Sequence, residues 1–343
     1  MKRTKIKLCI VAAVSMAALA ACGGPQNALD SAGVQAGRLE SLWWIFFWVC
    51  SAVYVIVMAI LVIAFFRNKR ADENTSPELR PDQSREARAG NIIKGAVGVS
   101  LIILFTLMVL SFRTGRAINS LSYAESPIEI QITGNQWWWD VEYRDPVPSM
   151  NIRTANELHL PVGRPVKLNL QSTDVIHSFW LPNMHGKIDL IPGYKTTFFF
   201  QPDEVGTYFG QCAEFCGYQH AKMRFAVTVE SQEDYEKWAA AQRQVPPPPA
   251  DPIQQRGQQI FLTSVCTQCH AVAGTTANAR VGPDLTHVAT RHYIAAASMH
   301  NVHDHLKTWI TDPQRIKPGV RMPMNNYAEE DLNALVTYLE NLK

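Results

Sequence analysis

The sequence lacks a charge excess of either sign. Its 343 residues include 32 lysines and arginines and 30 aspartates and glutamates, and the formal net charge is +2. Only 18% of the residues are charged. Because non-specific binding to nucleic acid needs clustered basic side chains, this balance argues against a nucleic acid as a partner.

The sequence also lacks spare cysteines. Each of the seven cysteines lies in a segment that suggests its own role, so none is left over for a disulfide framework. The length of 343 residues predicts about two domains with additional segments. The chemistry should therefore reside in a few short motifs.

The apolar run nearest the N-terminus is too short to span a bilayer. Basic residues in the first seven positions are followed by an apolar run at residues 8–20, which has the length of a signal peptide. The run ends in L-A-A-C at residues 19–22, which resembles a bacterial lipobox. We therefore expect residues 1–21 to be a lipoprotein-type signal peptide and Cys22 to be lipidated. The alternative is an ordinary cleavage site with an incidental cysteine.

Two longer apolar segments follow, at residues 42–66 and 92–112. Each is long enough to cross a bilayer as a helix. The connection between them is rich in lysine and arginine, whereas the outer flanks carry few cations, so the connection is expected in the cytoplasm. The sequence therefore predicts a two-helix transmembrane hairpin at residues 38–118 of a bacterial inner membrane protein, with everything after Phe112 on the periplasmic side.

Residues 125–230 show the alternation of apolar and polar residues that is typical of β-strands. Ile128, Ile130 and Ile132 alternate with polar residues, and Pro192-Gly193 provides a turn. This pattern predicts an antiparallel β-sandwich or barrel. A sheet of this kind would hold both ends of the loop that precedes its last strand.

That loop gathers metal-binding side chains. Residues 211–223 read Q-C-A-E-F-C-G-Y-Q-H-A-K-M. Thiolate, imidazole and thioether ligands select soft or borderline metals such as copper. His177, upstream in the sequence, offers a second imidazole. We interpret His177 and this loop as one metal site.

A second domain is expected beyond a proline-rich linker. Residues 231–251 combine a polar segment of helical potential with four successive prolines, which favour an extended conformation and cannot join a core. Residues 252–343 then contain Cys266-Thr267-Gln268-Cys269-His270. In this pattern two thiols attach haem c covalently and the adjacent histidine ligates the iron.

The haem iron needs a second axial ligand, and a methionine thioether is the usual one in c-type cytochromes. We favour Met322, because Pro323 would fix a loop rather than a helix, and Met324 is the alternative. Five histidines of this domain are interpreted as solvated surface, because no cysteine or carboxylate frames them. They are His287, His292, His300, His303 and His305.

These motifs resemble two known families. The chain from the first long apolar segment to about residue 230 resembles subunit II of haem-copper cytochrome c oxidases. The residues that carry this resemblance are G-N-Q-W-W-W at 134–139, D-V-I-H-S-F-W at 174–180 and C-x-E-x-C-G-x-x-H-x-x-M at 212–223. Residues 252–343, with G-P-D-L at 282–285, resemble a fused class I cytochrome c domain. The resemblance implies a multidomain chain with a transmembrane hairpin, an all-β cupredoxin-like barrel and an all-α cytochrome c domain.

The resemblance also implies a dinuclear copper centre, CuA. Its ligands would be the bridging thiolates of Cys212 and Cys216, the imidazoles of His177 and His220, the thioether of Met223 and the backbone carbonyl of Glu214. The Glu214 carboxylate would help to hold a magnesium or manganese ion shared with subunit I. Trp137 would be the residue at which electrons reach CuA. The second apolar segment lacks the family's usual glutamate, so Glu86 is the one nearby candidate for proton uptake.

The function implied by the resemblance is one-electron relay. A donor outside the membrane, a cytochrome c or a bc-type complex, would reduce haem c, and electrons would pass through CuA to subunit I, where O₂ is reduced and protons are pumped. The chain would then assemble with subunit I and the other oxidase subunits, and the linker would tether a haem domain that can approach CuA. Two alternatives are the subunit that receives electrons in a CuA-type nitric oxide reductase, and a stand-alone membrane-tethered electron carrier.

Overall fold

The computed structural model describes residues 24–67, 82–119 and 126–343. The expected signal peptide and Cys22 lie outside the described residues. The chain divides into two compact units, of which the smaller contains Arg38–Ser120. The larger contains the remaining residues, including both predicted metal-binding domains.

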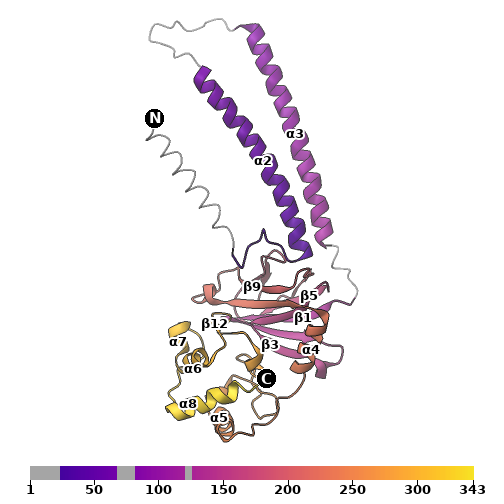
Figure 1. Cartoon of the computed structure of the whole chain (residues 1–343). Coiled ribbons are helices and arrows are strands. Elements are labelled where there is room, and N and C mark those ends of the chain that lie inside the picture. The colour runs from indigo at the N-terminus through magenta and orange to yellow at the C-terminus, as the bar shows by residue number, and fades with distance from the viewer. Residues whose placement is uncertain (1–23, 68–81, 120–125) are drawn as a thin grey trace, which may run out of the picture. The chain divides into compact units, whose positions relative to one another are not determined.

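Two long helices account for most of the smaller unit (Figure 1). Helix α2 spans Val34–Arg67 and helix α3 spans Gln83–Asn119. Both are long and apolar enough to cross a membrane, by length and composition. Arg38 of α2 donates a hydrogen bond to the carbonyl oxygen of Ala117 in α3. The predicted pair of apolar N-terminal helices is confirmed.

The β domain contains ten strands among the described residues. They are β1 (Ile128–Asn135), β2 (Trp138–Arg144), β3 (Ile152–Ala155), β4 (Glu157–Pro161), β5 (Val166–Ser172), β6 (His177–Trp180), β7 (Ile188–Leu190), β8 (Thr196–Phe200), β9 (Gly206–Cys212) and β10 (Arg224–Glu230). One five-stranded sheet has the order β3-β2-β1-β5-β8 and the other has the order β4-β10-β9-β6-β7. The predicted all-β cupredoxin-like domain is confirmed.

The alternation of apolar and polar residues gives each sheet one buried face. Ile130 of β1 and Leu168 of β5 lie opposite each other and are fully buried. Phe179 stacks on Phe225 with 4.3 Å between ring centroids, and the Trp139 ring meets Phe179 edge to face at 5.7 Å. Aromatic pairs of this kind stabilise a core beyond their area of burial. The result is a stiff frame beneath β6 and β9.

Both sheets are mixed, so the prediction of an antiparallel sandwich was wrong. Strand β1 runs parallel to β5, and β10 runs parallel to β4. Period-two alternation reports which face of a strand is buried, and it is the same for both strand directions. The chain passes through β4 in the second sheet before it returns to the first sheet at β5, and this crossover makes β1 and β5 parallel.

The C-terminal domain is built from short helices. They are α5 (Pro252–Thr263), α6 (His303–Thr311), α7 (Pro313–Ile316) and α8 (Glu329–Leu339), with the 3₁₀ helices η4 (Val265–Gln268) and η5 (Val288–Thr290) and the strands β11 (Tyr293–Ile294) and β12 (Met299–His300). Asp251 caps α5 by accepting a hydrogen bond from the Ile253 N–H. Apart from the two-residue strands, the predicted helical cytochrome c domain is confirmed.

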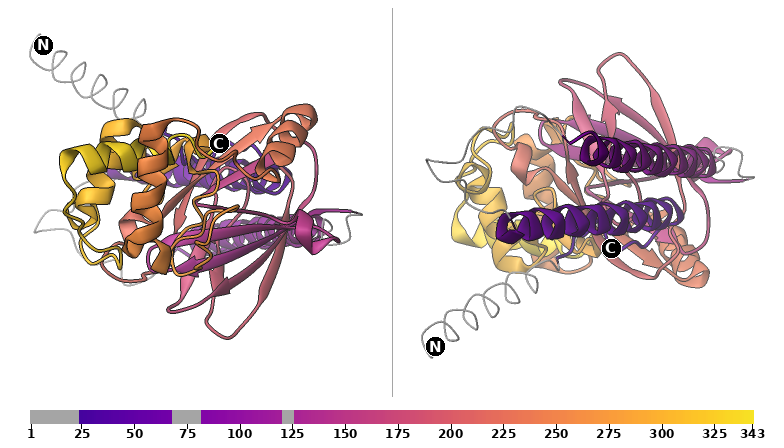
Figure 2. Two further views of the ribbon diagram at one scale, coloured as in Figure 1. Left: turned by 90° about the horizontal axis from the view of Figure 1, so that it is seen from below. Right: turned by 90° about the horizontal axis from the view of Figure 1, so that it is seen from above.

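Residues 231–251 connect the two domains. Their first part forms helix α4 (Gln232–Gln242), whose Trp238 ring packs edge to face on Tyr143 of the β domain with 5.1 Å between centroids. The proline run that follows has no regular helix or strand. Figure 2 shows the helices of residues 252–343, coloured orange to yellow, gathered beside the strands of the β domain.

Candidate metal centres

The sheet brings His177 next to the cysteine loop. His177 begins β6, which pairs with β9 so that Phe179 lies opposite Cys212, the last residue of β9. The loop then returns to β10, and the Cys212 N–H donates to the Met223 carbonyl oxygen over 2.9 Å. Two paired strands therefore fix the start and the end of the predicted copper loop.

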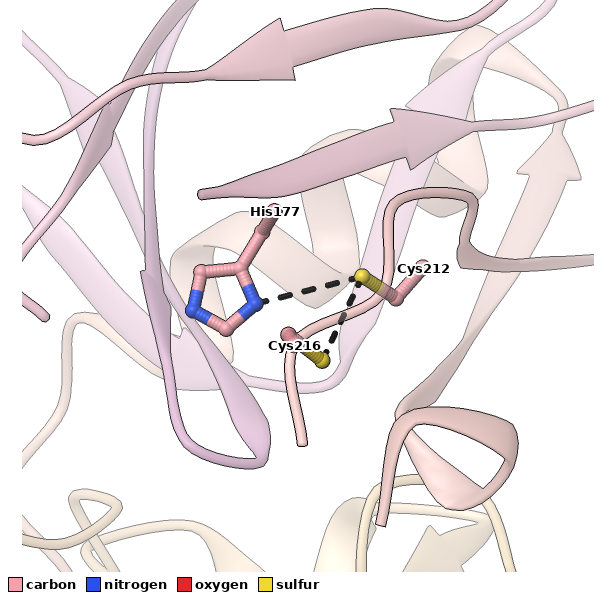
Figure 3. A group of neighbouring side chains, drawn as sticks. All are labelled: His177, Cys212 and Cys216. Carbon is pink, nitrogen blue, oxygen red and sulfur yellow. Dashed lines mark hydrogen bonds between the residues drawn. The ribbon is translucent and has the colours of Figure 1, made fainter. Parts of the chain in front are cut away.

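The first half of the predicted ligand set converges on Cys212. Its Sγ lies 3.7 Å from the Sγ of Cys216 and 3.9 Å from Nδ1 of His177 (Figure 3). The same sulfur lies 3.2 Å from the backbone oxygen of Glu214. His177, Cys212 and Cys216 are at most 2% exposed, so bulk water is excluded from the cluster.

The other half converges on Cys216. Its Sγ lies 3.6 Å from Nδ1 of His220 and 3.8 Å from Sδ of Met223, which is fully buried. His220 belongs to a short 3₁₀ helix, η3 (His220–Lys222). Contacts of 3.6–3.9 Å thus connect two thiols, two imidazoles and a thioether, which is a donor set that suits copper.

The two thiols are electrostatically coupled. The hydrogen bond between the sulfurs lowers the pKa of Cys212 and raises the pKa of Cys216, because one proton then serves both sulfur atoms. Thiolates are the form that binds metals. A cation held between these sulfurs would take the place of the shared proton.

Asp174 orients His177 from the side away from the sulfurs. Nε2 of His177 lies 2.9 Å from Oδ1 of Asp174, whose Oδ2 accepts a hydrogen bond from the Gln136 N–H over 2.7 Å. Burial alone would lower the pKa of His177, but hydrogen bonds to Asp174 and Cys212 raise it. A carboxylate behind a histidine is the common arrangement at metal sites. Sequence reasoning gave Asp174 no role, although its place three residues before His177 was a signal.

Trp137 lies against the backbone of the copper loop. Its Nε1 donates to the Cys216 carbonyl oxygen over 2.9 Å, and Gln136 Nε2 donates to the same oxygen over 2.8 Å. Gly217, the next residue of the loop, has a φ of 112°, and a Cβ atom there would lie 3.0 Å from the Trp137 ring. Only glycine permits this backbone and this close approach.

The Glu214 carboxylate stands apart from the sulfur cluster. Within the described ranges it forms no hydrogen bond or ion pair with another side chain, while its backbone oxygen approaches Cys212. The next residue, Phe215, is 76% exposed. Among the described residues, the Glu214 carboxylate thus has no side-chain partner.

A cavity of about 200 Å³ lies at the predicted haem-attachment residues. Cys266, Cys269, His270 and Met322 line it, and Trp137 contributes to its wall from the β domain. Met324, in contrast, is 63% exposed and is not part of the lining. The structure therefore brings Met322, rather than Met324, to the cavity that contains His270.

His270 is held in a fixed orientation. Its Nδ1 lies 2.7 Å from the Pro283 carbonyl oxygen, and burial lowers the pKa of the imidazole. A neutral ring whose Nδ1 is occupied offers Nε2 to a metal. A Cβ atom at Gly282 would lie 2.8 Å from this ring, so the position must be glycine. These contacts give Gly282 and Pro283 a physical role beyond the sequence signature.

Arg291 tests whether the cavity suits haem. It lines the cavity, is 8% exposed, and donates through Nη2 to the Asp284 carbonyl oxygen. Its Nε has no hydrogen-bond partner, and no carboxylate of the described residues forms an ion pair with it. A buried guanidinium without an anion is costly. The carboxylates of haem would satisfy it, so the residues present fit this cofactor.

One of the five C-terminal histidines differs from expectation. His287 is 5% exposed, so the interpretation of all five as solvated surface was wrong for this residue. It is the residue that immediately precedes η5. His292, His300 and His303 are exposed, as expected.

Comparisons with known proteins match both halves of the chain. The family described as cytochrome c oxidase subunit II, periplasmic domain, matches residues 128–230, and the cytochrome c family matches residues 254–343. Over 332 residues the chain is 31% identical to cytochrome c oxidase subunit 2 of Alkalihalophilus pseudofirmus, which covers 95% of this chain and 94% of that relative. Over 303 residues it is 30% identical to cytochrome c oxidase subunit 2 of Bacillus subtilis, with coverages of 84% and 83%.

Among solved structures, the chain is similar to the periplasmic domain of subunit II of cytochrome oxidase from Bradyrhizobium japonicum. The identity is 29% and the TM-score is 0.33. The match covers 35% of this chain and 96% of that chain.

Proposed function

Because the chain belongs to the cytochrome c oxidase subunit II family and carries a C-terminal cytochrome c domain, we propose that it relays single electrons from an external donor to subunit I of a haem-copper oxidase. When bound, a covalent haem c and a dinuclear CuA centre supply the two one-electron carriers of this relay. O₂ reduction and proton pumping are assigned to the other subunits. The chain is thus one part of a proton-translocating oxidoreductase.

The observation that carries the proposal is the position of Trp137. It lines the cavity that contains His270 and Met322, and it donates a hydrogen bond to the carbonyl oxygen of Cys216. One side chain therefore contacts both candidate cofactor sites. This contact supports Trp137 as the residue at which electrons reach CuA.

The predicted copper ligands suit an electron carrier whose ligand geometry changes little between the oxidised and reduced states. Cys212 and Cys216 would bridge the two ions, with their sulfurs 3.7 Å apart, while His177 and His220 would bind one ion each. Met223 and the backbone oxygen of Glu214 would complete the set. Strands β6 and β9 fix the ends of this ligand set, which limits rearrangement on electron transfer.

The predicted haem ligands line a separate cavity, to which Trp137 of the β domain also contributes. Cys266 and Cys269 would form the thioether bonds, and His270 and Met322 would be the axial ligands. The thioether of Met322 would raise the reduction potential relative to a second imidazole. We assign a cytochrome c or a bc-type complex as the external donor.

We assign α2 and α3 to two passes through a bacterial inner membrane, with the copper and haem domains in the periplasm and Cys22 lipidated. The free carboxylate of Glu214 supports a magnesium or manganese site shared with subunit I. These assignments make the complete oxidase the functional unit.

Analysis of copper and haem in the purified full-length chain tests the proposal. We expect two coppers and one covalent haem per chain, with loss of copper in Cys216→Ser and unchanged copper in Cys50→Ser, which serves as the control. Zinc in the loop, or no covalent haem, would overturn the proposal. Purification from native membranes tests the assembly, because an oxidase requires a haem-copper subunit with O₂-reducing activity in the same complex.

A further inference from the structure

The haem domain is bound to the copper domain through their two ligand-bearing loops. Gln219, in the copper loop, donates through Nε2 to the Pro318 carbonyl oxygen over 2.7 Å. Lys222, in the same loop, donates through Nζ to the Ile316 carbonyl oxygen. Residues 316–319, which precede Met322, therefore rest on the loop that joins Cys216 to Met223.

Lys317 lies at the centre of this contact. Its side chain is 2% exposed, and its Nζ donates to the Trp137 carbonyl oxygen over 2.8 Å and to the Ala295 carbonyl oxygen over 3.4 Å. Trp137 belongs to the β domain and Ala295 to the haem domain. One amino group thus connects the backbones of both domains.

Burial makes the positive charge of Lys317 energetically unfavourable. No carboxylate in the described part of the chain forms an ion pair with it, and burial, reinforced by Lys222, lowers the pKa of Lys317 to about 7. An apolar side chain would fill the space without this cost. The two carbonyl contacts are what a lysine provides here and an apolar residue does not.

The same loop also approaches the tryptophan ring and the haem cavity. Gly319 has a φ of 90°, and a Cβ atom there would lie 3.8 Å from Cη2 of Trp137. Three residues later, Met322 lines the cavity. The position of Lys317 on the Trp137 carbonyl therefore sets how the Met322 loop lies against Trp137.

We propose that Lys317 is a positioning residue that locks the Met322 loop onto Trp137, so that electrons pass between two domains held in one bound arrangement. This inference rests on the proposed function, since it takes haem c and CuA as the carriers. In this arrangement the haem domain is docked on the β domain, whereas the linker alone would leave it tethered and free to approach. The hydrogen bond from Lys317 to the Trp137 carbonyl is the contact that makes this difference.

The test compares Lys317→Met, which keeps an unbranched side chain one atom shorter and removes the donor, with Lys317→Arg, which keeps a donor. Lys195→Met, at an exposed lysine of the β domain, is the matched control. Two quantities are measured on the loaded oxidase complex. They are amide hydrogen exchange in residues 217–222 and 316–319, and the rate of copper reduction after flash reduction of the haem.

K317M should raise amide exchange in both segments. It should also lower the docked fraction, and with it the rate of copper reduction, by roughly 5- to 150-fold, which is the range of a coupling between sites. K317R should restore at least part of both, and K195M should match the wild type. The proposal is overturned if K317M matches K195M, or if exchange rises throughout the β domain, which would indicate a folding defect. Loss of copper or haem from the wild type would instead contradict the proposed function.

Discussion

The indole Nε1 of Trp137 donates a hydrogen bond to the carbonyl oxygen of Cys216 over 2.9 Å, while the carbonyl oxygen of Trp137 accepts one from Lys317 over 2.8 Å. Trp137 is therefore hydrogen-bonded both to a residue of the predicted copper site and to the haem domain.

Replacing Trp137 with glutamine should slow electron transfer into the copper site at least tenfold, about 1.4 kcal/mol in barrier height. The reason is that the ring fills the space between the haem cavity and Cys216. The copper ligands are untouched, so the visible spectrum of copper should persist. Stopped-flow reduction of the copper band measures the rate. Unchanged turnover would remove Trp137 from the path.

Replacing Asp174 with asparagine should weaken copper binding by about 10- to 100-fold. The carboxylate holds Nε2 of His177 and accepts the Gln136 N–H, so its charge and geometry keep Nδ1 directed at Cys212. Competition with a copper chelator measures the affinity. Asp189→Asn, at an exposed position on β7, is the control and should bind copper like the wild type. Equal affinities in the two variants would contradict a supporting role for Asp174.

Replacing Met322 with alanine should abolish the sulfur-to-iron charge-transfer band and lower the haem reduction potential, because a thioether ligand raises it. Met324→Ala should change neither, since Met324 is 63% exposed and lies outside the cavity lining. Near-infrared spectra of the oxidised protein report the band, and a redox titration of the haem measures the potential. Loss of the band in the Met324 variant alone would reverse the assignment.

Replacing Gly282 with alanine should reduce covalent haem incorporation. The new Cβ atom would lie 2.8 Å from the His270 ring, and overpacking of this kind costs about 1–3 kcal/mol. The ring would have to turn away from Pro283, which orients it. Haem staining and absorbance per mole of purified chain report incorporation. Gly186→Ala, where a Cβ atom meets open space, should incorporate haem normally.

The β domain should lose stability as the pH rises above about 6.5. Nδ1 of His159 lies 3.0 Å from Glu230 and Nε2 lies 3.0 Å from Glu157. Burial opposes the charge, but the two hydrogen bonds outweigh it and raise the pKa of His159 above its usual value of 6.5. This contribution is complete below the unfolded-state pKa and disappears as the pH rises through the higher folded-state pKa.

Thermal unfolding between pH 5 and pH 9 measures this effect. His159→Gln should flatten the pH dependence, because it removes the titrating imidazole that stacks on Trp238. His303→Gln is the control, since His303 is an exposed histidine paired with Glu340. A wild-type curve as flat as that of His159→Gln would contradict the assignment.

The candidate metal site was predictable because its predicted ligands are nearly contiguous. All except His177 lie within residues 211–223, so their spacing alone indicates a cluster, and the haem-attachment motif is equally local. The two long helices were predictable from length and composition. Local patterns of this kind can be recognised in the sequence because the residues that act together are neighbours in the chain.

The remaining features depend on contacts that no local pattern reports. Lys317 and Trp137 are 180 positions apart, and neither flanking sequence indicates that they meet. The parallel pairing of β1 with β5 results from a crossover between sheets, which alternation does not encode. The choice between Met322 and Met324 needed the cavity itself.

Trp137 is only 7% exposed, and residues of the haem domain form part of its cover, since Lys317 donates to its carbonyl oxygen and Gly319 lies near its ring. A soluble redox protein has no access to this ring while the cover is in place. Under the proposed function, this arrangement would impose an order of reduction, in which donors are recognised by the outer surface of residues 252–343 and the copper site receives electrons only from within the chain. In the proposed oxidase, the fused domain would thus shield the copper site sterically from unsuitable reductants in the periplasm.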